Sequence, residues 1–410
     1  TSLSAVSLAG QVQFVLSLFI SGIAAGAGIM AAQYWGKQDA ASIEKVIPIA
    51  LRTNLLFSGL FTILAGFCPE MLMRIFTNDA ALVASGSQYL RAVALSYVLC
   101  GISQVYLILL KNTGHAAVSS RISSTAVVLN IILNAILIYG LCGAPALGIR
   151  GAAYATVAAR VVELIWAYLE TKKPERVRIL WNRLFSSAGK ILSEDFWRYT
   201  LPVLAASLVW GIAYVLYSVI MGHMGSDAVA ANSITSIAKS LLSCLIRGVS
   251  GGAGVLIGNL LGANELEKAR EYGGRLSHLS IAIGIVTGGL LMLISPAIVH
   301  FAPLSDTAAE YLQYMLLFCG LNLMAQSVNT TVLDGIFCAG GDAKFDMQGN
   351  IGAMWCFSVP LGFLAAFWLK LPVMVVYCIV NLDEIVKLPA VYHHYKKYIW
   401  VRNITRDVED

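Results

Sequence analysis

Charged side chains are scarce in this sequence of 410 residues. Only 12% of its residues are Asp, Glu, Lys or Arg, against about 25% in typical soluble domains, and 58% are hydrophobic. Charged residues are absent from the stretches 1–36, 92–110, 122–149, 199–226, 276–305, 311–333 and 347–369. Each stretch approaches or exceeds the roughly 20 apolar residues that cross a bilayer as a helix. The composition excludes a soluble protein and predicts an all-α, polytopic membrane protein.

Motifs for metal binding, redox chemistry and catalysis are also missing. The closest two of the eight cysteines, Cys338 and Cys356, are 18 residues apart, so no CxxC pair exists for zinc, haem or a disulfide exchange. The basic residues that produce the net charge of +5 lie between apolar stretches, which argues against a nucleic-acid partner. We expect no enzyme, no catalytic residues, no metal site and no cofactor.

Eleven membrane-spanning helices are predicted from the spacing of the charges. Their approximate ranges are 10–35, 47–73, 86–110, 119–143, 148–170, 200–222, 236–261, 277–300, 308–335, 345–369 and 371–391. When the loops alternate across the membrane, 21 of the 28 Lys and Arg residues fall on the side of the 171–198 connection and four on the other. The positive-inside rule therefore predicts that this connection and the C-terminus are cytoplasmic, in the cell membrane.

The predicted domain organisation has two lobes. An N-terminal lobe spans 1–170 and a C-terminal lobe spans 199–392, followed by a basic cytoplasmic tail at 393–410. Hydrophobic residues recur among the charges of 171–198, so we expect an amphipathic helix on the membrane surface to link the lobes.

The two lobes contain related sequences. Gly22, Gly26, Gly28 and Gly36 in FISGIAAGAGIMAAQYWGK (19–37) align without a gap on four glycines of LIRGVSGGAGVLIGNLLGA (245–263), at an offset of 226. At an offset of 227, LLKNTGHA (109–116) aligns with IFCAGGDA (336–343). We interpret this as a duplication. The glycines do not form GxGxxG, so close packing of helices explains them better than a nucleotide site.

The offset also predicts a helix that is missing from this sequence. The span at 200–222 has no counterpart in the first half, because residues 1–9 align with the loop that follows it, 227–235. We therefore expect six helices per lobe, with the first one absent here and eleven present. An even number per repeat predicts that the lobes superpose as parallel repeats, with Gly26 and Gly252 in equivalent places.

The chain resembles the multidrug and toxic compound extrusion (MATE) family over essentially its whole length. The similarity rests on SGIAAGAGIMAAQYWGK (21–37), ALGIRGAAYATVAARVVE (146–163), GHMGSDAVAANSI (222–234) and GGAGVLIGNLLGA (251–263). The resemblance implies two six-helix lobes around a central cleft and alternating access.

It also implies a function. The expected activity is antiport, in which organic, often cationic, compounds are exported in exchange for sodium or protons, by a monomer. The alternative, from the same superfamily, is a flippase for a lipid-linked oligosaccharide or cell-wall precursor. A flippase cavity needs several basic residues for a diphosphate, and only Lys239 and Arg247 are unpaired candidates within the spans.

Ionisable and amide groups inside the spans are the candidate functional residues. Arg160 and Glu163 are three residues apart on a helix, and we interpret them as a structural ion pair. Asn130 and Asn134 share one helix face in LNIILNAILI. In the family this helix often carries Asn-x-x-x-Asp at a cation site, which implies an ion-binding role, although interhelical hydrogen bonding explains the pair equally well. Asn134 stands where the acid would be.

The second lobe supplies further candidates. Asp334 lies near the end of its span, either as a helix cap or as a charge in the lobe's cavity. Asp383, Glu384 and Lys387 cluster near the end of the last span, and we interpret them as solvated interfacial charges.

Aromatic residues of the span 200–222 form a stripe. Trp210, Tyr214 and Tyr217 are spaced by four and three residues, so they share one face. Such a stripe usually faces lipid or a neighbouring helix, but it can also bind cationic aromatic substrates.

Overall fold

The computed structural model describes residues 2–143, 145–174, 176–179, 181–184 and 189–407. All secondary-structure elements in these ranges are helical, as predicted. The chain divides into two compact units, Thr1–Leu204 and Ala205–Asp407. We call them unit 1 and unit 2.

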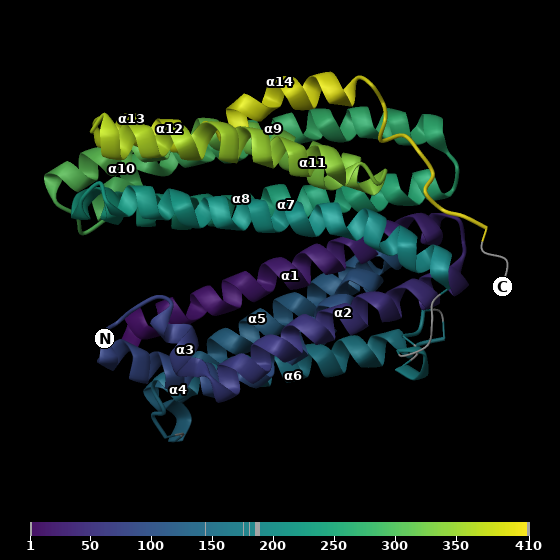
Figure 1. Cartoon of the computed structure of the whole chain (residues 1–410), viewed down its shortest axis with the longest axis horizontal. Helices are drawn as coiled ribbons and strands as arrows, with labels where there is room; N and C mark the ends of the chain where they lie inside the picture. The colour runs from purple at the N-terminus through teal and green to yellow at the C-terminus, as the bar shows by residue number, and fades with distance from the viewer. Residues whose placement is uncertain (1, 144, 175, 180, 185–188, 408–410) are drawn as a thin grey trace. The chain divides into compact units, whose positions relative to one another are not determined.

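Unit 1 is a bundle of long helices (Figure 1). Its central helix, α4, packs against α1, α2 and α6. Asp39 and Asp79 cap the N-termini of α2 and α4, because their carboxylates accept hydrogen bonds from the first free backbone N–H groups. The helices are α1 (Ser2–Gly36), α2 (Ala40–Phe67), α3 (Pro69–Arg74), α4 (Ala80–Leu110), α5 (Ala116–Tyr139), α6 (Ile149–Thr171) and the first part of α7 (Lys190–Gly222).

Unit 2 has a similar bundle in which α10 is central and packs against α8, α9 and α14. Three π-helical turns interrupt its C-terminal half, at Thr331–Phe337 (η4), Ile351–Ser358 (η5) and Leu364–Trp368 (η6). The other helices are α8 (Ser226–Gly262), α9 (Leu266–Phe301), α10 (Asp306–Thr330), α11 (Ala343–Asn350), α12 (Val359–Phe363), α13 (Val373–Val380) and α14 (Asp383–Tyr395).

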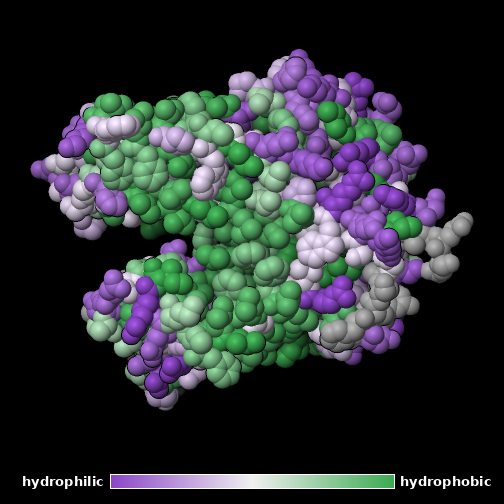
Figure 2. Space-filling model, in the orientation of Figure 1, coloured by the Kyte–Doolittle hydropathy of each residue, from purple (hydrophilic) through white to green (hydrophobic). Residues whose placement is uncertain are grey.

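Apolar side chains cover the middle of the helices in both units, whereas polar side chains gather at the helix ends (Figure 2). On α2 the exposed Leu56, Leu60, Ile63 and Phe67 follow helical spacing and form one apolar stripe. Nine helical segments within the described ranges are long and apolar enough to cross a membrane. One of them, Ala80–Tyr139, contains both α4 and α5.

The last predicted span, 371–391, is not one helix. Helix α13 ends at Val380 and α14 begins at Asp383, so the prediction of a continuous span is wrong. Asn381, the C-cap of α13, is a residue type common at helix ends, but the apolar residues on both sides of it predicted one continuous span.

The amphipathic helix expected over 171–198 is also not found as a separate element. Thr171 ends α6 and Lys190 begins α7, while the described residues between them form turns and one short 3-10 turn, Trp181–Arg183. Residues 175, 180 and 185–188 lie outside the described ranges. Charged residues of this segment instead pair locally, since both Lys173 and Arg176 contact Glu170.

Backbone geometry repeats at the offset that the sequence predicts. Gln38 and Asn264, 226 positions apart, have φ values of 64° and 60°. Gly114 and Gly341, 227 positions apart, have φ values of 80° and 72°. A left-handed residue is uncommon, so its recurrence at both positions supports the duplication. The parallel superposition of the two lobes stays a prediction.

Small residues let α9 approach α10. A Cβ added to Gly288 would collide with the carbonyl oxygen of Gly320, whereas one added to the neighbouring Gly289 would have no atom within 4 Å. We predict that Gly288→Val lowers the free energy of unfolding by about 1–3 kcal/mol, because an overpacked interface must open. Thermal unfolding of the purified protein in detergent measures this. Gly289→Val is the matched control, and equal melting temperatures for the two variants would contradict the prediction.

Candidate functional site

In unit 1, Asn130 and Asn134 form a hydrogen-bonded ladder. Asn134 Nδ2 donates to Asn130 Oδ1 at 3.1 Å, and Asn130 Nδ2 donates to the Thr156 hydroxyl of α6 at 3.4 Å. Thr156 in turn donates to the carbonyl of Ala152. Asn134 Oδ1 is the atom of this ladder that is buried without a hydrogen-bond partner among the described residues. The ladder connects α5 to α6 and brings no carboxylate to the pair.

Arg160 and Glu163 form an ion pair on α6. One guanidinium nitrogen of Arg160 lies 2.9 Å from each carboxylate oxygen of Glu163. Ser103 of α4 donates to the same carboxylate at 2.6 Å. Glu163 is buried, while Arg160 lines a cavity of about 210 Å³ between α1, α4 and α6. This cavity has Gln13, Gln104 and three serines in its wall but no carboxylate.

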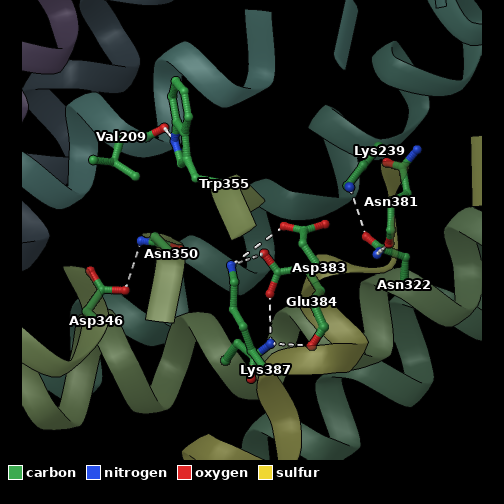
Figure 3. Close-up of polar contacts among 11 residues, drawn as sticks. Val209, Lys239, Asn322, Asp346, Asn350, Trp355, Asn381, Asp383, Glu384 and Lys387 are labelled. Atoms are coloured by element: carbon green, nitrogen blue, oxygen red, sulfur yellow. Dashed lines mark hydrogen bonds and ion pairs between the residues drawn. The ribbon is translucent and has the colours of Figure 1, made fainter. Parts of the chain in front are cut away.

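In unit 2, the break between α13 and α14 brings charges into the interior. Asp383 and Glu384 occupy the first turn of α14, where the helix dipole favours negative charge. Lys387 Nζ lies 3.3 Å from Glu384 Oε1 and 3.6 Å from Asp383 Oδ2 (Figure 3). Asp383 and Lys387 are buried. Our interpretation of these three residues as solvated interfacial charges is therefore wrong.

Two asparagines of α10 stabilise this break. Asn322 Nδ2 donates at 2.6 Å to the carbonyl of Asn381, which follows the last residue of α13 (Figure 3). Asn329 Nδ2 donates to the backbone and carboxylate oxygens of Glu384, at 2.7 and 2.8 Å. Lys239 of α8 donates to Asn322 Oδ1 at 2.8 Å, so Lys239 is engaged in the same network.

Asp334 and Asp346 are the remaining carboxylates of this region. Asp346 of α11 is buried and accepts a hydrogen bond from Asn350 at 3.1 Å. Asp334 lies on η4, where its neighbours Leu333 and Gly335 are buried and its own side chain is exposed. In the described part of the chain, no hydrogen bond or ion pair engages Asp334.

These residues act on one another electrostatically. The charge of Asp334 interacts with the charges of Arg247, Glu384 and Lys387. The charge of Asp346 interacts with that of Asp334. We define the unit 2 charge cluster as Asp334, Asp346, Asp383, Glu384, Lys239, Arg247 and Lys387. Its four carboxylates and three cationic side chains sum to a formal charge of −1.

The aromatic stripe on α7 is only partly available to a ligand. Trp210 and Tyr214 stack with ring centroids 5.6 Å apart, and the Arg247 guanidinium lies 5.6 Å from the centre of the Trp210 ring. Tyr217 is buried in the core of unit 2. The Trp210 ring is therefore already in contact with a cation, whereas the Tyr214 side chain is exposed.

Sequence reasoning named Asp334, Lys239 and Arg247 but did not name Asp346, Asp383, Glu384 or Lys387 as site residues. The signal was present, because Asp383 and Lys387 are four residues apart within an apolar span. Among the described residues, no three His, Cys, Asp or Glu side chains converge as a metal site.

Comparisons with known proteins identify relatives along nearly the whole chain. The family profile described as MatE matches residues 1–136 and 202–364. An "Uncharacterized transporter YisQ" of Bacillus subtilis is 21% identical over 98% of this chain and 88% of its own length. A "Probable multidrug resistance protein NorM" of Thermotoga maritima is 23% identical over 90% of this chain and 79% of its own length.

Solved structures show the same fold. A multidrug resistance MATE family transporter of the MOP superfamily, in an outward-facing conformation, superposes with a TM-score of 0.86 at 19% identity, over 97% of this chain and 88% of that one. A MOP superfamily transporter of Pyrococcus furiosus, described by the reverse polarity of its binding pocket, has a TM-score of 0.87 at 19% identity and the same coverage.

The ion triplet around Lys387 generates a prediction about stability. Lys387→Met leaves two carboxylates without their cation, and we expect the free energy of unfolding to fall by about 3–5 kcal/mol. The control is Lys344→Met, which removes an exposed ammonium. Adding Asp383→Asn to Lys387→Met should restore part of the loss. Denaturation in detergent at neutral pH measures all three variants, and a Lys387→Met protein as stable as the control contradicts the prediction.

Proposed function

The chain belongs to the MATE family of multidrug transporters, and we propose that it exports organic compounds in exchange for sodium ions or protons. The family consists of transporters rather than enzymes, and the chain is a multi-pass membrane protein. We propose further that a cation gradient supplies the energy and that the coupling cation binds at the unit 2 charge cluster. The working form is a monomer.

The formal charge of −1 in the unit 2 charge cluster supports the proposal best. Lys387 neutralises part of the charge of Asp383 and Glu384, and Asn350 donates to Asp346. Asp334 has no such partner and is exposed. A cation that binds at Asp334 makes the cluster neutral, and its release restores the charge. Exchange of an ion for a substrate needs a site whose charge changes in this way.

The candidate residues of unit 1 lack a carboxylate without a partner, which supports placing the cation site in unit 2. Asn130 and Asn134 carry no charge, and Glu163 is already paired with Arg160. The cavity beside Arg160 has no carboxylate in its wall. We therefore assign the attraction for the coupling cation to unit 2 rather than to unit 1.

Organic, often cationic, compounds remain the proposed substrates. The exposed ring of Tyr214 offers a surface for stacking or for a cation, since the faces of aromatic rings attract positive charge. The flippase alternative has less support, because Lys239 is bonded to Asn322 and the Arg247 guanidinium lies over the Trp210 ring. The bias of basic residues supports a cytoplasmic C-terminus in the plasma membrane.

We predict that Asp334→Asn reduces ion-driven efflux more than Asn134→Ala does. The first variant removes the ionisable group that binds the coupling cation, whereas the second shortens an uncharged ladder. The assay follows the efflux of a cationic dye from vesicles that contain the full-length protein, with a sodium gradient or a pH gradient imposed separately. Asn134→Ala is the control at equal protein level. Wild-type rates for Asp334→Asn under both gradients would exclude Asp334 as the coupling residue.

A further inference from the structure

The C-terminal segment of unit 2 is bound to the loop that follows η4, the turn that carries Asp334, and to the end of α8. We define residues 395–405 as the C-terminal strap. Arg402 Nε donates to the carbonyl of Gly340 and Arg402 Nη2 to the carbonyl of Gly341, each at 2.7 Å. Asn403 Nδ2 donates to the carbonyl of Gly262, the last residue of α8, at 3.3 Å. The strap therefore satisfies the carbonyl of the last residue of α8 and two carbonyls of the loop that follows η4.

Trp400 anchors the strap in the interior. Its side chain is fully buried in a cluster that includes Val332, Leu333, Ile336 and Phe337 of η4. The chain passes so close to Gly340 that an added Cβ would overlap the carbonyl oxygen of Trp400, and one added to Gly273 would lie 2.5 Å from the indole ring. Glycine is required at both positions for the strap to dock.

A second contact joins the start of the strap to the same loop. His394 Nε2, next to the strap, lies 2.6 Å from Oδ2 of Asp342, which directly follows Gly340 and Gly341. Phe345 stacks on the His394 ring with centroids 3.8 Å apart. Residues 340–342 are thus held from two sides by the C-terminal part of the chain.

The π-helical turn η4 lies between this loop and α8. Before the turn, Ser250 of α8 donates to the carbonyl of Thr330 at 2.8 Å. Within it, a Cβ added to Gly335 would lie 2.8 Å from the carbonyl oxygen of Ser250. After it, the strap holds Gly340 and Gly341. A π-helical turn is rare and less favourable than α-helix, so outside contacts must maintain it. Asp334 is the exposed residue of the turn that these contacts maintain.

We propose that the strap positions Asp334 by holding η4 in its π-helical register. Loss of the strap lets the turn revert toward an α-helix, which rotates Asp334 relative to the charges that face it. Those charges are Arg247 of α8, Asp346 of α11, and Glu384 and Lys387 of α14. Arg402 and Trp400 are then positioning residues. Their effect on transport rests on the proposed function, whereas their effect on the geometry of Asp334 does not.

The test uses Arg402→Met, which removes both hydrogen bonds to Gly340 and Gly341, in the full-length protein. Lys397→Met is the matched control, because Lys397 is an exposed cation of the strap. In a protein whose native cysteines are replaced, Asp334→Cys is labelled with a water-soluble maleimide. We expect Arg402→Met to change the labelling rate at least about fivefold, the lower end of coupling between linked sites. Arg402→Lys, which keeps a donor, should give an intermediate rate.

The pH dependence of efflux is the second readout. With Asp334 intact, Arg402→Met should shift the midpoint of the pH profile, because rotation of the turn changes the distances from Asp334 to Arg247, Glu384 and Lys387. An unchanged labelling rate and midpoint in Arg402→Met and Arg402→Lys, relative to Lys397→Met, would overturn the role of the strap. If Asp334→Asn transports at the wild-type rate while Arg402→Met still alters labelling, the proposed function fails and the role of the strap stands.

Discussion

Lys387 and the two carboxylates beside it allow charged side chains to lie inside unit 2 at the start of α14. A charged side chain within a membrane helix is costly unless a partner or water neutralises it, so Asp383 and Glu384 are tolerated because Lys387 follows one turn later. Asn322 and Asn329 satisfy the backbone that the break exposes.

The cost of a charge without a partner also separates the residues that stabilise unit 2 from those that can bind an ion. Lys239, Asp346 and the Lys387 triplet have hydrogen-bond or ion-pair partners. Asp334 is exposed on a π-helical turn whose neighbouring residues are buried. The residues with partners fix the geometry, whereas Asp334 is the carboxylate that we propose as the site of the coupling cation. This difference in partners, rather than the residue type, makes Asp334 the candidate coupling group.

The duplication preserved backbone geometry more than chemistry. Gln38 and Asn264 share an uncommon conformation, and so do Gly114 and Gly341. In contrast, the candidate residues of unit 1 form an uncharged ladder and one ion pair, while the unit 2 charge cluster has seven charged side chains. Backbone turns are set by local packing that both repeats require. Charges within the membrane persist only where a function or a partner keeps them.

Composition alone determined that the chain is a helical membrane protein, because runs without charge and of bilayer length have no other stable arrangement. The glycine offset predicted the repeat, and the i,i+3 spacing predicted the Arg160–Glu163 pair. The break at Asn381, the buried state of Lys387 and the exposure of Asp334 were decided by tertiary structure. Each depends on contacts between residues distant in sequence, such as the hydrogen bond from Asn322 to Asn381. Helical periodicity carries no information about which distant polar group will be the partner.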